Sequence, residues 1–107
     1  IQIIDANNEN KSYAWLGATI RIVNGLGDRS AFGLPDERGI VITNVEKGSL
    51  ADKAGLSRND VIRIMADKDI STIEEVFALT EENRWKGKVF VTIIRNQTEE
   101  KIQIKFK

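Results

Sequence analysis

The sequence predicts a mainly β fold with two helices: a five- to six-stranded antiparallel, partly open barrel or sandwich that a short and a longer helix cap. Five short segments either alternate apolar and polar residues or run through β-branched residues, as strands do. Two further segments carry the start and stop residues of helices. The strands are joined by short turns, without the strand–helix–strand series that builds a parallel dinucleotide-binding sheet.

Composition limits what the chain can do. Its 107 residues suit one domain, and 41% hydrophobic with 30% charged residues is typical of a folded protein. Sixteen basic and sixteen acidic residues cancel, which argues against a phosphate-driven nucleic-acid binder. The absence of Cys and His excludes a disulfide, a thiolate nucleophile, a serine–histidine triad and imidazole-bound zinc. No run reaches the ~18–20 apolar residues of a membrane span. The composition therefore argues against most self-contained enzymes, and no cofactor is predicted.

The N-terminal residues 1–12 are predicted to be a linker or extension. A short apolar run, residues 1–4, precedes polar, turn-prone residues, and this run offers a strand that could pair with a sheet edge. The domain itself is expected over residues 13–107. Its first strand is residues 18–23, where Ile20 and Ile22 alternate with Thr19 and Arg21.

The remaining elements follow in order along the chain. Residues 28–38 hold the single proline and are predicted to be a surface loop, and the β-branched run at 39–45 a buried strand. A short helix is expected over 49–55 and a strand over 60–65. A longer helix follows at 72–85, opened by a capping box on Ser71 or on Thr72. Segments 89–94 and 101–107 form the closing hairpin.

No side-chain constellation in the sequence forms a catalytic or metal site. Gly25-Leu26-Gly27 indicates a turn, because the spacing of a phosphate-binding loop is missing. Ser49 and Ser71 are explained as helix caps. What remains is backbone: if the strand after Gly17 lies at a sheet edge beside the longer helix, an extended peptide could add to it. A glycine just before that strand would let successive amides converge on a terminal carboxylate.

Residues 48–62, Gly-Ser-Leu-Ala-Asp-Lys-Ala-Gly-Leu-Ser-Arg-Asn-Asp-Val-Ile, resemble the "GSPAAKAGLKPGDVI" signature of bacterial PDZ domains. The departures are Leu50 and Arg58 in place of proline, and Asn59 in place of glycine. Residues 15–18, Trp-Leu-Gly-Ala, are similar to the loop that opens the PDZ domains of HtrA-type serine proteases. The resemblance covers about residues 13–107, and the order of elements matches the permuted, bacterial form of this PDZ-like fold.

The resemblance implies roles for particular residues. Backbone amides of Leu16, Gly17 and Ala18 would hold the carboxylate of a ligand, and strand residues 18–23 would pair with it. Ile20 and Ile22 belong either to the core or to the pocket floor. The side of the peptide site formed by the loop and strand is predicted to comprise Trp15, Leu16, Gly17, Ala18, Thr19 and Ile20. The facing helix would contribute Thr72, Val76, Leu79 and Thr80, or, shifted by one residue, Ile73, Phe77 and Thr80. Trp15 is bulkier than the usual Tyr or Phe.

The function that this resemblance implies is capture of hydrophobic C-terminal tails by strand addition. The chain would be a non-catalytic recognition module of a larger, periplasmic or otherwise extracytoplasmic HtrA-like serine protease. Its partners would be peptides and a protease domain, with no metal, cofactor, nucleic acid or membrane span. Alternatives are an interaction module whose own N-terminal segment fills the groove, or the PDZ domain of an intramembrane metalloprotease, a tail-specific protease or a secretion component.

Overall fold

The computed structural model describes residues 3–5 and 12–106. Within these residues the chain forms eight strands and three helices. In chain order they are β1 Ile3–Asp5, β2 Ser12–Trp15, β3 Ala18–Ile22, α1 Gly25–Phe32, β4 Ile40–Val45, α2 Leu50–Ala54, β5 Val61–Met65, β6 Lys68–Asp69, α3 Ile73–Arg84, β7 Lys88–Arg95 and β8 Thr98–Lys105. The predicted mainly β, antiparallel class is confirmed, and the sheet is open.

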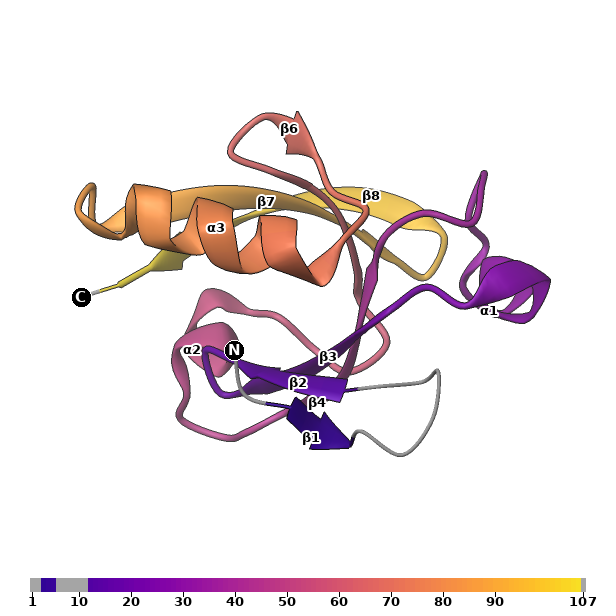
Figure 1. Ribbon diagram of the computed structural model, residues 1–107, viewed down its shortest axis with the longest axis horizontal. Coiled ribbons are helices and arrows are strands. Elements are labelled where there is room, and N and C mark those ends of the chain that lie inside the picture. The colour runs from indigo at the N-terminus through magenta and orange to yellow at the C-terminus, as the bar shows by residue number, and fades with distance from the viewer. Residues whose placement is uncertain (1–2, 6–11, 107) are drawn as a thin grey trace.

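One antiparallel sheet holds all the described strands. The strand order is β1-β2-β3-β4-β5-β7-β8, and β6 pairs with β5 beside this path. The sheet curls, so that β1 to β4 lie at the bottom of Figure 1 and the long β7–β8 hairpin lies at the top. Helix α3 crosses the front between these two halves, α2 lies at the left, and α1 projects at the right (Figure 1).

The core fills the space between the two halves of the curled sheet and α3. It draws fully buried side chains from β3, β4, β5, β7 and β8, and Val76 of α3 is also completely buried. The largest side chains of this kind include Ile20, Ile40, Ile42, Ile62, Met65, Ile70, Ile93 and Ile104. Of the two alternatives for Ile20, the core and the pocket floor, the structure shows the core, whereas Ile22 is 42% exposed.

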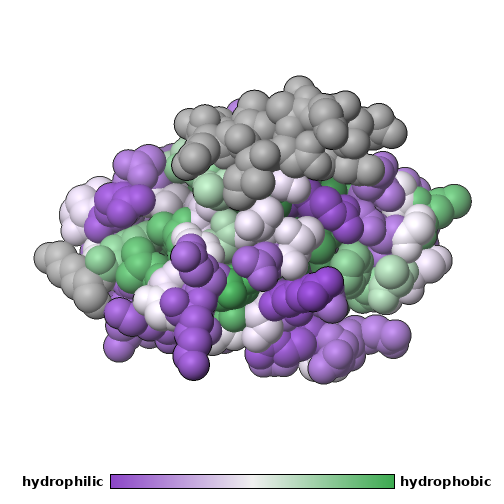
Figure 2. All heavy atoms as spheres, turned by 90° about the horizontal axis from the view of Figure 1, so that it is seen from below, coloured by the Kyte–Doolittle hydropathy of each residue, from purple (hydrophilic) through white to green (hydrophobic). Residues whose placement is uncertain are grey.

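A second, smaller cluster supports the α1 side of the molecule. It contains Val23, Leu34, Val41, Val61 and Ile94, with the half-buried ring of Phe32 packed against it. Seen from below, hydrophobic residues lie in small groups among hydrophilic ones (Figure 2).

Helix α1 shows that two predictions are wrong. Residues 25–27, predicted as a turn, open the helix, and residues 28–32 continue it where a surface loop was predicted over 28–38. The carboxylate of Asp28 accepts two hydrogen bonds from Arg21, of 2.5 and 3.0 Å, and one of 2.7 Å from the Asn24 amide. The Arg21 guanidinium holds the pKa of Asp28 below its usual value. At the other end Gly33 takes the left-handed conformation and donates to helical carbonyls. Because α1 buries no residue, it lacks the apolar periodicity by which a helix is found in a sequence.

Two arginines hold the α1–β4 loop and the loop that precedes β5. Arg63, 7% exposed, donates two hydrogen bonds to Asp36, of 2.6 and 3.1 Å, and another to the Arg38 carbonyl. The hydrogen bond from Arg63 holds the pKa of Asp36 well below its usual range. Arg95 on β7 donates to Asp60, which is 1% exposed, and the Asp60 hydrogen bond raises the pKa of Arg95.

The two predicted helices begin where the sequence places their caps. The Ser49 hydroxyl accepts from the Asp52 amide at 3.1 Å and opens α2, and Gly55 closes that helix with φ 94°. For α3 the second of the two alternatives holds: Thr72 accepts from the Glu75 amide, and Glu75 accepts from the Thr72 amide. Backbone hydrogen bonds from Ser71 and Thr72 lower the pKa of Glu75.

Candidate functional site

The predicted carboxylate loop forms the two-residue turn of a β-hairpin. Leu16 has φ 52° and Gly17 has φ 84°, and positive values at both central residues define the type I′ turn that joins β2 to β3. The turn is held from outside, because the Leu16 carbonyl accepts from the Ala51 amide at 3.1 Å and the Gly17 carbonyl from the Glu46 amide at 2.9 Å. It therefore lies against the start of α2.

Strand β3 is not at an edge of the sheet, so the prediction that residues 18–23 form a free sheet edge is wrong. On one side Ala18, Thr19 and Ile20 pair with β2, and on the other side the whole of β3 pairs with β4. The missed element is β2. Its signal in the sequence is the Tyr-Ala-Trp stretch ahead of Leu-Gly, since a glycine-containing pair between two β-prone segments favours a tight hairpin.

Trp15 connects this hairpin to α3. Its indole is 2% exposed, and Nε1 donates to the Thr80 hydroxyl at 2.9 Å. Thr80 in turn donates to the Val76 carbonyl at 2.6 Å. Burying a Trp side chain of 150–250 Å² is worth about 4–6 kcal/mol at roughly 25 cal/mol per Å². Leu16 is half-buried and packs against the same core. The expectation that the loop and the helix come together is thus met by a side-chain contact.

The helix residues predicted to face a ligand turn mostly toward the core. Val76, Leu79 and Thr80 are 0%, 6% and 2% exposed, and Thr72 is occupied as the N-cap of α3. In the alternative set shifted by one residue, Ile73 is 7% exposed and Phe77 is half-buried against the main core. Phe77 is therefore the most accessible apolar side chain of the two sets.

The outer margin of this half of the sheet is β1. It pairs antiparallel with β2, with Ile3 opposite Tyr13 and Asp5 opposite Ser12. Within the described residues, β1 has β2 as its one partner. The sequence predicts that residues 1–4 can pair with a sheet edge, and the edge that β1 covers is that of β2.

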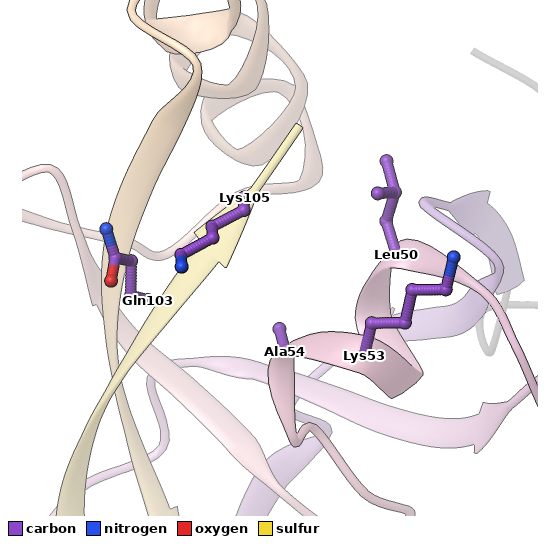
Figure 3. Close-up of a pocket in the computed structure, with 5 residues that line it drawn as sticks. All are labelled: Leu50, Lys53, Ala54, Gln103 and Lys105. Carbon is purple, nitrogen blue, oxygen red and sulfur yellow. The ribbon is translucent and has the colours of Figure 1, made fainter. Parts of the chain in front are cut away.

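A cavity of about 270 Å³ lies at the other end of the sheet, between α2 and β8 (Figure 3). Leu50, Lys53 and Ala54 line it from α2, and Gln103 and Lys105 line it from β8. In Figure 3 the Lys105 side chain extends toward Gln103 rather than toward α2. The apolar lining on the α2 side therefore comes from Leu50 and Ala54.

In the part of the chain that the structure describes, no group of three or more Asp, Glu, His or Cys side chains is placed to hold a metal ion. No helix among the described residues is long and apolar enough to cross a bilayer.

The curled antiparallel sheet, the capped helix α2 and the helix α3 beside the β2–β3 hairpin together define a PDZ-type fold. The PDZ domain family model matches residues 6–94, and the chain belongs to this family. No curated protein sequence matches the chain significantly.

Solved structures with the same fold include HtrA-type proteins. One is the HtrA-type protease AlgW with a decapeptide, at 22% identity and a TM-score of 0.66 over 88% of this chain. Another is the HtrA3 PDZ domain bound to a phage-derived ligand (FGRWV), at 17% identity and a TM-score of 0.67 over 88% of this chain and 86% of that one. The match spans 29% of the AlgW chain.

Proposed function

We propose that this PDZ domain binds hydrophobic C-terminal tails as an added β-strand, at the margin of the sheet that β1 now covers. The observation that carries the proposal is the placement of β2. It is tied to α3 through Trp15, while its outer edge is paired with a strand of only three residues, Ile3–Asp5. Membership of the PDZ family and the peptides held by the AlgW and HtrA3 structures support the same function.

The relative cost of displacing each strand favours β2 over β3 as the docking edge. A peptide on β3 would first have to remove β2, which exposes Trp15, a loss of about 4–6 kcal/mol of burial. A peptide on β2 would replace β1 alone, which pairs at two register positions. The carboxylate would then be bound near the β2–β3 turn, where Leu16, Gly17 and Ala18 remain the proposed ligands.

Calorimetry with a hydrophobic C-terminal peptide and its amidated copy tests this function. The chain that starts at residue 6 lacks β1 and should bind the free-acid peptide more tightly than the full chain does. Amidation should weaken binding severalfold if a carboxylate is recognised. Equal affinity of both peptides would remove the carboxylate site, and an absence of binding in both chains would refute peptide capture.

A cross-link distinguishes the two edges. Ala14 and Thr19 lie directly opposite each other in β2 and β3, close enough for a disulfide, and the chain has no other cysteine. In the Ala14→Cys/Thr19→Cys variant, oxidation locks the hairpin. Peptide binding that survives oxidation supports addition to β2, whereas binding seen only in the reduced form supports addition to β3.

The second candidate is a non-catalytic interaction module whose groove stays occupied by its own chain. The pairing of β1 with β2, and of β2 with β3, favours it. In that case the full chain would bind no peptide, and removal of residues 1–5 would create binding that the full chain lacks. No gain on removal would count against occlusion by that segment.

We also propose that the domain serves a larger, extracytoplasmic HtrA-like serine protease and has no hydrolytic activity itself. The support is the similarity to the AlgW and HtrA3 domains. The flanking coding sequence tests it, since a serine protease domain must adjoin this chain, and a metalloprotease or tail-specific protease there would contradict it. Cell fractionation tests the compartment, and peptide cleavage by the pure chain would refute the inactive role.

A further inference from the structure

Lysines and exposed aromatic rings gather where α3 ends and β7 begins. We call this the lysine–aromatic surface: Trp85, Lys86, Lys88, Phe90 and Lys101. Trp85 is 79% exposed and Phe90 is 42% exposed. The Lys86 ammonium lies 5.6 Å from the Trp85 ring, and the Phe90 ring has Lys88 at 5.9 Å and Lys101 at 5.2 Å. Rings and charges thus form one continuous patch.

The charge of this patch is not neutralised within the molecule. The ion pairs among the described residues all use arginine, so none of the three lysines is paired with a described carboxylate. Among the residues that line the hollow between these side chains, Asp67 is the one acid. The whole chain has a formal net charge of zero, so the local positive excess comes from how charges are distributed over the surface.

A hollow of about 430 Å³ separates these side chains. Lys86, Lys88, Phe90 and Lys101 line it together with Asn83 at the end of α3 and the β5–β6 turn. Its lining places three ammonium groups around a space that a phosphate-bearing headgroup can enter. Trp85 is not among the lining residues; it stands in the α3–β7 turn, which projects at the left end of the molecule in Figure 1.

We propose that the lysine–aromatic surface docks on an anionic lipid bilayer. Aromatic rings with a polar edge favour the headgroup level of a membrane, and lysines near an anionic surface are attracted to its phosphates. An acidic peptide would satisfy the lysines in the hollow, but it gives no role to a nearly fully exposed Trp on a projecting turn. The contact is peripheral, with Trp85 at headgroup depth and the lysines facing lipid phosphates.

This inference does not depend on the proposed peptide site. β1 and β2 lie at the bottom of Figure 1 and the β7–β8 hairpin lies at the top, so peptide and membrane would be held on different sides.

Sedimentation of the full chain with lipid vesicles tests the proposal. Vesicles of phosphatidylglycerol and phosphatidylcholine should carry the protein down at low salt and release it at high salt, and pure phosphatidylcholine vesicles should not bind it. Each lysine is worth about fivefold in partitioning, so Lys88→Gln/Lys101→Gln should lower it about 25-fold. The matched control Arg29→Gln/Lys47→Gln removes two exposed charges elsewhere and should bind like the parent chain.

Fluorescence gives an independent readout of insertion. Brominated lipids should quench Trp85, whereas Trp15 is 2% exposed and should keep its emission. Trp85→Phe should therefore lose the quenching and retain charge-dependent sedimentation. Equal binding to neutral vesicles, equal losses in the two double variants, or no sedimentation at all would overturn the proposal. So would binding of polyglutamate, but not of vesicles, that depends on Lys88 and Lys101, since the partner would then be an acidic polypeptide.

Discussion

The hydrogen bond between Trp15 and Thr80 holds the β2–β3 hairpin against α3, and its removal has a predictable cost. Thr80→Val keeps the shape of the side chain but leaves the buried indole N–H without its acceptor. An unsatisfied buried donor costs about 1–3 kcal/mol. For a domain of this size, each kcal/mol of lost stability lowers the Tm by about 4–8 °C.

The partner substitution behaves differently. Trp15→Phe removes the donor, but the Thr80 hydroxyl still donates to the Val76 carbonyl at 2.6 Å, so no polar group is stranded. Its cost is the smaller ring, about 1–3 kcal/mol. In the double variant, Val at position 80 no longer leaves an unpaired N–H, so the total loss should be about 1–2 kcal/mol less than the sum of the single losses.

Urea unfolding followed by far-ultraviolet circular dichroism measures the cycle, since this signal does not depend on the tryptophan that is replaced. Thr80→Ser, which retains the hydroxyl, is the control and should lose less stability than Thr80→Val. If the losses in unfolding free energy of the two single variants add up to that of the double variant within about 0.3 kcal/mol, the two side chains are not coupled. The hydrogen bond would then not stabilise the contact between hairpin and helix.

Three further predictions concern the elements around this contact. Thr72→Ala should cost about 1 kcal/mol in urea unfolding and Ser71→Ala much less, because Thr72 is the N-cap of α3; equal losses would contradict that assignment. Gly17→Ala should destabilise strongly in thermal unfolding, because φ is +84° and a Cβ would lie 2.1 Å from the Cβ of Ser49; a variant as stable as the parent would contradict the turn. The free energy of unfolding should stay constant from neutral pH down to about 4 and then fall. The Arg63 guanidinium holds the pKa of Asp36 below its unfolded value, and this stabilisation is lost as the carboxylate protonates. Acid titration followed by circular dichroism would refute this if stability were unchanged below pH 4.

Much of the fold could be predicted because its signals are local. A few neighbouring residues are enough to identify several elements: the helix caps Ser49 and Thr72, the left-handed Gly55 and the β-branched strand at 40–45. Helix α1 could not be found in this way, since it is stabilised by the contact of Asp28 with Arg21 and buries no residue. Strand β6 has only two residues, too few for any periodicity to be recognised.

The candidate site shows a different limit. The sequence places Trp15, Gly17 and Thr80 in one region, and the structure brings Trp15 and Thr80 to 2.9 Å. Which edge of a strand is free, however, depends on what pairs with it from elsewhere in the chain, and no local pattern encodes that. The expectation of an open edge on β3 was therefore wrong.

The position of β2 has a consequence for how the domain would be controlled. β2 runs antiparallel to β3 on the side opposite β4, so this chain already contains the strand that addition to β3 would supply. On the proposed function, a ligand would exchange with the short outer strand β1 at low cost, because β1 contributes few backbone pairs and its loss leaves Trp15 buried. The observed peptide affinity would then depend on how much more strongly the peptide pairs with the β2 edge than β1 does. A substitution that weakens β1 pairing should therefore raise peptide affinity without altering the site itself.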